Sequence, residues 1–221
     1  MAQPGSNHGR YVRWLLALLT VVSASAASGG SPYTFDAPGQ YLTRAIDYPR
    51  WAALWSRHLD QTPAIDACLQ NASACPERLK GYREVVLRAH DLPPPRKMIL
   101  VNRFINGRQW HIESGAHDDW RTLTDFLTYG GDCEDYAIAK YFALRQIGFA
   151  ADDVRVAIAR DSEASAFHAV TVVRIDGRIY FLDVDGAPRR SESNYRFLFS
   201  INENAVWDHV TPEVKAEENR S

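Results

Sequence analysis

The chain has 221 residues, of which 46% are hydrophobic, 24% charged and 11% aromatic, and its formal net charge is -2 at pH 7. This composition excludes collagen-like, coiled-coil and wholly disordered chains, and the length suits one domain with a buried core. The slightly negative charge does not suit a nucleic-acid-binding protein, which needs a basic surface.

Residues 1–26 have the pattern of a secretory signal peptide. Two arginines precede the apolar run Trp14–Val22, and Ser23–Ala26 has the small-residue spacing of a signal-peptidase site. The alternative is an uncleaved membrane anchor, but the apolar run is short for a membrane-spanning helix. We therefore expect a secreted chain without a membrane span after cleavage, and a flexible leader over residues 27–50.

The periodicity of apolar residues predicts helices first and strands afterwards. Spacings of three and four predict amphipathic helices between residues 51 and 90, and further helices follow at 97–106, 123–130 and 133–147. The period then becomes two, which predicts strands at 154–159, 167–173 and 178–183. We expect one α+β domain over residues 51–215, with a helical part at 51–147 and a sheet part at 153–210.

The three cysteines are Cys68, Cys75 and Cys133. In an oxidising compartment two of them can pair and one is left over. Cys68 and Cys75 are seven residues apart and could close a small loop between two helices, or both could stay unpaired. In either case Cys133 is the odd thiol, and it lies in the first turn of a predicted helix. Backbone N–H groups and the helix dipole stabilise a thiolate at that position.

A histidine and two aspartates are predicted to lie near this helix. The pair Asp176-Gly177 between two strands is a signal for a two-residue hairpin. An ideal hairpin places His168 directly opposite Asp185 and diagonally next to Asp183. A histidine and a carboxylate facing a cysteine helix suit a nucleophile, a base and an orienting acid. The hairpin alone does not choose between the two aspartates.

Three acids flank the cysteine, namely Asp132, Glu134 and Asp135. Like charges raise the pKa of a thiol, so these acids oppose the effect of the helix terminus. They either complement the helix dipole or hold a hard cation, for which Ca²⁺ is the best candidate. The sequence contains no complete EF-hand loop.

The segment Gly130–Arg145 resembles the cysteine segment of the bacterial transglutaminase-like cysteine proteinases, the LapG-type periplasmic proteases. The resemblance runs from about residue 97 to 210 in the same order, through Val101-Asn102, Asn106, Phe167–Val170, Tyr180–Asp183 and Phe199–Trp207. It implies a papain-like fold, with the cysteine helix packed on an antiparallel sheet, and a calcium-dependent cysteine endopeptidase. The family's catalytic residues correspond to Cys133 as nucleophile, His168 as base and Asp183 as orienting acid, and its calcium-linked acids to Asp132, Glu134 and Asp135.

The resemblance also implies a biological setting. Proteases of this family act in the periplasm of Gram-negative bacteria, where they cleave large surface adhesins near the N-terminus and release cells from biofilm. An inner-membrane receptor that responds to cyclic-di-GMP holds them inactive. This chain departs from the family at Val184-Asp185, where Asn commonly follows the orienting acid, and at Asp118–Thr124, where an aromatic–small–Pro segment is expected.

The expected mechanism is thioester formation on Cys133, with the N–H of that residue as an oxyanion donor and Asn102 or Asn106 as candidates for the second donor. Three other functions use the same residues: a transglutaminase-like acyl transferase, a peptidoglycan amidase, and a non-catalytic calcium-binding module that docks a receptor. A zinc site is disfavoured because no C-x-x-C or H-x-x-H spacing supports it.

Overall fold

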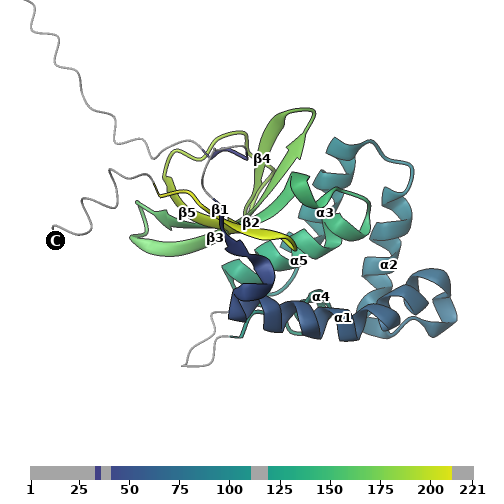
Figure 1. The fold of residues 1–221 in the computed structure, drawn as a ribbon. Helices are drawn as coiled ribbons and strands as arrows, with labels where there is room; N and C mark the ends of the chain where they lie inside the picture. The colour runs from purple at the N-terminus through teal and green to yellow at the C-terminus, as the bar shows by residue number, and fades with distance from the viewer. Residues whose placement is uncertain (1–32, 36–40, 111–118, 211–221) are drawn as a thin grey trace, which may run out of the picture.

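The computed structural model describes residues 33–35, 41–110 and 119–210. Helices lie to one side of an antiparallel sheet (Figure 1), so the α+β prediction is confirmed. The predicted signal peptide lies outside the described residues. In the described ranges, no helix has both the length and the apolar character that a membrane crossing requires.

The helices follow the predicted order closely. They are α1 (Pro49–Gln70), α2 (Glu77–Ala89), α3 (Pro94–Asn106), α4 (Leu123–Tyr129) and α5 (Cys133–Gln146), with short 3₁₀ helices η1 (Ala45–Asp47), η2 (Ala72–Ala74) and η3 (Ala151–Asp153). Helix α3 begins three residues before the predicted start. A proline is accommodated in the first turn of a helix, where its missing N–H would have no partner.

The sheet contains six strands in the described residues, in the order β1-β6-β5-β2-β3-β4. They are β1 (Tyr41–Arg44), β2 (Val154–Asp161), β3 (Ala166–Ile175), β4 (Arg178–Leu182), β5 (Tyr195–Ile201) and β6 (Ala205–Asp208). The hairpin between β3 and β4 pairs Ile175 with Arg178, which is the register that the Asp-Gly turn predicts.

The start of the domain differs from the sequence-based expectation of a flexible leader over residues 27–50. Strand β1 pairs antiparallel with β6, so segments more than 160 residues apart in the chain lie side by side. Tyr33 and Phe35 are buried in a second, smaller hydrophobic cluster with residues of β2 and β5. Tyr33 and Phe35 pack on the domain because burial removes apolar surface from water, whereas β1 is held by its backbone pairing with β6.

Helix α5 lies at the centre of the larger hydrophobic cluster. Every residue from Asp135 to Leu144 is buried, and the helix contacts α3, α4, β2 and β3. A helix that is buried on all sides has a fixed position, because neighbours on every face would have to move with it. The residue at the start of α5 is therefore held rigidly relative to the sheet.

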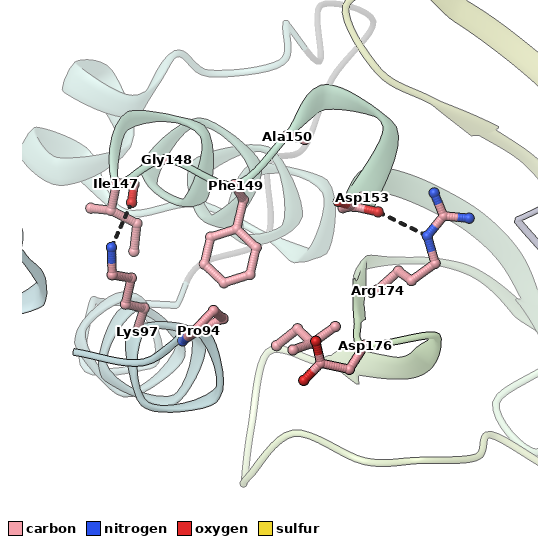
Figure 2. A pocket seen from close by; sticks show the side chains of 10 residues that line it. Pro94, Lys97, Ile147, Gly148, Phe149, Ala150, Asp153, Arg174 and Asp176 are labelled. Carbon is pink, nitrogen blue, oxygen red and sulfur yellow. Dashed lines mark hydrogen bonds and ion pairs between the residues drawn. The ribbon is translucent and has the colours of Figure 1, made fainter.

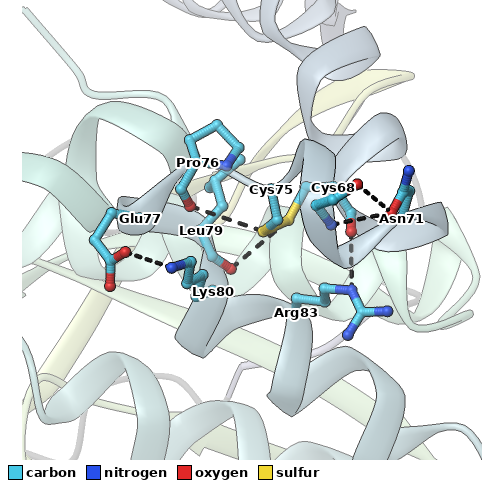
Figure 3. The surroundings of a disulfide bond; sticks show 9 residues. Cys68, Asn71, Cys75, Pro76, Glu77, Leu79, Lys80 and Arg83 are labelled. Carbon is cyan, nitrogen blue, oxygen red and sulfur yellow. Dashed lines mark hydrogen bonds and ion pairs between the residues drawn. A yellow bond between two sulfur atoms is a disulfide. The ribbon is translucent and has the colours of Figure 1, made fainter.

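The structure joins Cys68 and Cys75 in a disulfide that closes the loop between α1 and α2 (Figure 3). Arg83 of α2 donates a hydrogen bond of 2.9 Å to the carbonyl oxygen of Cys68. This pairing is the one that the sequence left open. Cys133 is the free cysteine, as the count of three implies.

A cleft of about 290 Å³ lies between the start of α3, the end of α5 and strand β3 (Figure 2). Three of its charged side chains have partners within the protein. Arg174 forms an ion pair of 2.8 Å with Asp153, and Lys97 donates to the carbonyl oxygen of Ile147 at 3.3 Å. This cleft shares no lining residue with the cavity at Cys133, so it is not the candidate active site.

Candidate active site

Two glycines form the turn that presents Cys133 at the start of α5. Gly130 has a φ of 73°, and a Cβ atom there would lie 2.0 Å from the carbonyl oxygen of Gln109. A Cβ atom on Gly131 would lie 2.2 Å from a carboxylate oxygen of Asp135. Neither position has room for a side chain, so the sequence Gly-Gly before Asp-Cys is required by the local geometry.

The thiol of Cys133 is half-buried and lines a cavity of about 710 Å³. Its sulfur donates a hydrogen bond of 3.0 Å to a carboxylate oxygen of Glu134. Burial, followed by the charge of Glu134 and this hydrogen bond, raises the pKa of the thiol above its usual value, while a backbone hydrogen bond at Ala169 lowers it. The acids next to the cysteine therefore oppose the thiolate, as their charge predicts.

His168 lines the same cavity as Cys133 and pairs with Asp183. The distance from His168 Nε2 to Asp183 Oδ1 is 2.7 Å. Strand β4 ends at Leu182, so the ladder stops before Asp185 would come opposite His168, and Asp185 is exposed. The structure thus brings the histidine to Asp183. With Nε2 bound to the carboxylate, Nδ1 is the ring nitrogen that remains to exchange a proton with the thiol.

The carboxylate of Asp183 accepts four hydrogen bonds. Oδ1 also accepts from the backbone N–H of Val184 at 2.7 Å, and Oδ2 accepts from Tyr195 Oη at 2.5 Å and from an Arg189 guanidinium nitrogen at 2.7 Å. Burial would raise the pKa of Asp183, but the hydrogen bonds from His168 and Tyr195 hold it well below its usual value. Asp183 is therefore an ionised acceptor, which suits the orientation of an imidazole.

Sequence reasoning missed Tyr195 and Arg189. Tyr195 comes from β5, a strand that was not among the predicted ones, and Arg189 lies in the connection between β4 and β5. The only local signal for their roles is that they follow Asp183 by 12 and six residues. Such spacing does not by itself indicate a contact.

Asn102 and Asn106 occupy a different place from the one expected for oxyanion donors. Asn102 donates to the carbonyl oxygen of Gly186 at 3.0 Å, and Asn106 donates to that of Asp183 at 3.1 Å. Both line a second cavity of about 660 Å³ rather than the cavity at Cys133. The expectation is therefore wrong, because their amides hold the loop after β4 instead.

The three acids around the cysteine separate into two groups. Asp132 and Glu134 line the cavity with Cys133. Asp135 points into the protein, where its Oδ1 accepts the backbone N–H of Arg121 at 2.7 Å. In the ranges that the structure describes, no group of three His, Cys, Asp or Glu side chains is close enough to hold a metal ion.

The donor chemistry at Asp132 and Glu134 nevertheless suits a hard cation. Oδ1 of Asp132 is buried without a hydrogen-bond partner, and carboxylate oxygens are the ligands that Ca²⁺ prefers. Asp132 and Glu134 fit such an ion better than Asp135, which is engaged with Arg121. The prediction of a three-acid calcium site stays a prediction.

A cysteine at the start of a buried helix, in one cavity with a sheet histidine that is paired with an aspartate, is the arrangement of papain-like thiol hydrolases. The family model of the bacterial transglutaminase-like cysteine proteinases (BTLCP) matches residues 62–214. This match covers more than half of the chain, and the chain belongs to that family. The resemblance seen in the sequence is thereby confirmed.

Solved structures agree on the fold. The chain is similar to Legionella pneumophila LapG in a calcium-bound form, with a TM-score of 0.58 and 20% identity over 71% of this chain and 96% of that one. It is also similar to an EGTA-treated form of the same protein, with a TM-score of 0.58 and 23% identity over 66% and 85% of the two chains. No curated protein matches the sequence. At these identities the likeness establishes the papain-like, transglutaminase-like fold alone.

Proposed function

We propose that this protein is a calcium-dependent periplasmic cysteine endopeptidase that cleaves the N-terminal region of a large surface adhesin and so promotes biofilm release. The observation that carries the catalytic part is the 2.7 Å pair of His168 and Asp183 in the cavity that also contains Cys133. Membership of the proteinase family supports the same reaction class.

In the proposed mechanism Cys133 is the nucleophile, His168 the base and Asp183 the orienting acid. His168 accepts the thiol proton at Nδ1, while Asp183 fixes the tautomer through Nε2 and stabilises the imidazolium. The thiolate attacks a peptide carbonyl, and the imidazolium then protonates the leaving amine. Water hydrolyses the thioester with His168 again as base. The backbone N–H of Cys133 is a candidate donor to the oxyanion.

The raised pKa of the Cys133 thiol is the obstacle to this mechanism. Burial raises it most, and the carboxylate of Glu134 raises it further. A Ca²⁺ ion held by Asp132 and Glu134 would supply positive charge that offsets this repulsion. The LapG structures similar to this chain include a calcium-bound and an EGTA-treated form, which supports the choice of cation.

The cavity suits an extended peptide. Its rim carries two exposed aromatic side chains, Phe167 at 67% and Trp110 at 46% exposure, and its wall includes Ile158, Leu198 and Phe199. Apolar walls with a few polar groups at the reacting centre are typical of sites that bind a substrate by its shape.

The proposal is tested by incubating the mature chain with the surface adhesin of the same genome, in Ca²⁺ and in EGTA. We expect one N-terminal cleavage in Ca²⁺, none in EGTA and none with Cys133→Ala. Incorporation of an amine donor instead would indicate a transglutaminase, and cleavage of muropeptides an amidase. Calcium binding without any reaction would indicate a receptor-docking module.

Two parts of the proposal concern the compartment and the regulatory partner of the protease. We expect the N-terminus of the protein recovered from the periplasm to begin near residue 27, which N-terminal sequencing would measure. We also propose that an inner-membrane receptor responding to cyclic-di-GMP sequesters the protease. Co-purification of the protease with that receptor should then rise when cyclic-di-GMP is abundant.

A further inference from the structure

Helix α5 buries a lysine directly beneath the loop that carries Asp183. Lys140 has 0% exposure, and its Nζ donates to the backbone carbonyl oxygen of Asp183. Burying an ammonium group costs free energy unless partners compensate, and an apolar residue of similar length would fill the space without that cost. Packing alone therefore does not explain a lysine at this position.

Lys140 is one of three side chains that donate hydrogen bonds to the backbone carbonyl oxygens of Asp183 and Gly186. Asn106 donates to the same carbonyl oxygen of Asp183 at 3.1 Å and to that of Gly186 at 3.4 Å. Asn102 donates to Gly186 at 3.0 Å. Two helices, α3 and α5, thus fix the backbone of residues 183–186 through side-chain donors. The carboxylate of Asp183 in turn forms the hydrogen bond with His168.

Two opposing effects act on the pKa of the buried Lys140. Burial lowers its pKa to about 7, while the carboxylates of Asp183 and Asp185 raise it. On its own helix the ammonium lies 5.8 Å from the centre of the Tyr136 ring, and α3 contributes the neutral amides of Asn102 and Asn106. None of these contacts touches the cavity at Cys133, so Lys140 acts only through the loop.

We propose that Lys140 is a positioning residue for the His168–Asp183 pair, holding the loop after β4 so that the carboxylate stays aligned with Nε2. This inference rests on the proposed protease function for its kinetic readout. Its geometric part, the alignment of Asp183 with His168, is independent of the substrate.

The test is Lys140→Met, which keeps the length of the side chain and removes the N–H donors. The melting temperature should change little, because the cost of burying the ammonium is removed while the carbonyl oxygen of Asp183 keeps its hydrogen bond from Asn106. We expect kcat to fall by about 10- to 100-fold with KM unchanged, since a small misplacement of a catalytic group has that effect. The low-field NMR resonance of the His168 Nε2 proton should shift upfield or broaden.

Lys97→Met is the matched control, because Lys97 also donates to a backbone carbonyl but in the separate cleft of Figure 2. It should leave kcat and the His168 resonance unchanged. Should Lys140→Met fail to fold, Asn106→Leu removes the other donor to Asp183 and should give a smaller change in the same direction.

A folded Lys140→Met protein with wild-type kcat and an unchanged His168 resonance would overturn the proposal. So would an unchanged resonance in folded Asn106→Leu. If the wild-type chain cleaves no protein at all, the protease function fails, but the NMR comparison still decides the role of Lys140.

Discussion

At the scale of single residues, the thiol of Cys133 is subject to two opposing influences. Its position at the start of α5 favours the thiolate, whereas burial and Glu134 favour the thiol. The second influence prevails in this structure: burial has the largest effect, and Glu134 adds to it by its charge and by accepting the S–H hydrogen bond. A cation that neutralises this carboxylate would therefore remove only part of the effect that favours the thiol.

Cys133→Ala should abolish cleavage while leaving the fold intact. The thiol lines a cavity and is half-buried, so its loss removes little packing. The measurements are product formation by mass spectrometry and the circular dichroism of the variant. Residual cleavage above a few per cent would contradict the role of Cys133 as nucleophile.

Glu134→Gln should lower the pKa of Cys133 in calcium-free buffer, because it removes the adjacent negative charge. Alkylation of the thiol by iodoacetamide at pH 7 should then be faster than in the wild-type chain, since the thiolate is the reacting form. Added Ca²⁺ should accelerate the wild type more than the variant. Equal alkylation rates in both proteins would show that Glu134 does not restrain the thiol.

Asp183→Asn and Asp185→Asn should differ sharply. The first replaces the partner of His168 and should reduce kcat by about 10³- to 10⁴-fold. The second changes an exposed residue beyond the end of β4 and should leave kcat within about twofold. Steady-state kinetics on a peptide substrate would measure both. The reverse order would identify Asp185 as the functional acid.

At the scale of elements, the turn between α4 and α5 is where backbone geometry limits the sequence most. Gly131 allows the carboxylate of Asp135 to approach the backbone, and that carboxylate binds the N–H of Arg121. The turn and the first turn of α5 thus support each other. A substitution there changes the placement of Cys133 as well as the stability.

Gly131→Ala should destabilise the protein by about 1–3 kcal/mol, because the added methyl group would overlap the Asp135 carboxylate. Gly81→Ala is the control: it lies within α2, and its Cβ would meet Phe104 at an ordinary distance of 3.5 Å. That change should be neutral or stabilising, since alanine favours helix. Urea unfolding would measure both, and equal effects would contradict the steric argument.

At the scale of the whole molecule, two partly buried histidines couple folding to pH. His58 lies 3.6 Å from the Phe142 ring, centre to centre, and its Nδ1 is buried without a hydrogen-bond partner. Burial lowers the pKa of His58 from 6.5 to about 4, and burial with the charge of Arg155 does the same for His209. Between pH 4 and pH 6.5 the unfolded chain therefore binds more protons than the folded chain.

The free energy of unfolding should therefore fall as the pH falls from 6.5 towards 4, by at most about 1.4 kcal/mol per pH unit for each histidine. Below pH 3.8 the lowered pKa of Asp183 decreases the free energy of unfolding further. The unfolded chain is then protonated at Asp183, while the folded chain keeps the carboxylate ionised. His58→Phe keeps the aromatic contact and should flatten the slope. Urea denaturation at several pH values measures this, and an identical slope in the variant would contradict it.

The sequence by itself determined the local features of this protein. Apolar periodicity gave the five α-helices and three of the strands, and the Asp-Gly pair fixed the register of the β3–β4 hairpin. The count of three cysteines left Cys133 as the odd thiol, and the segment Gly130–Arg145 indicated the family. All of these depend on residues close together in the chain, where turn chemistry and helical or strand period act directly.

Only the tertiary structure decided the choices that depend on distant residues. The end of β4 at Leu182 brought His168 to Asp183 rather than to Asp185, a choice that the hairpin register left open and that only the family resemblance had implied. Tyr195, Lys140 and the two asparagines reach the same loop from β5, α5 and α3. The pairing of β1 with β6 packed a segment that sequence alone predicted to be flexible. Such contacts leave no period in the sequence, because they arise only when the burial of α5 fixes how the helices and the sheet approach one another.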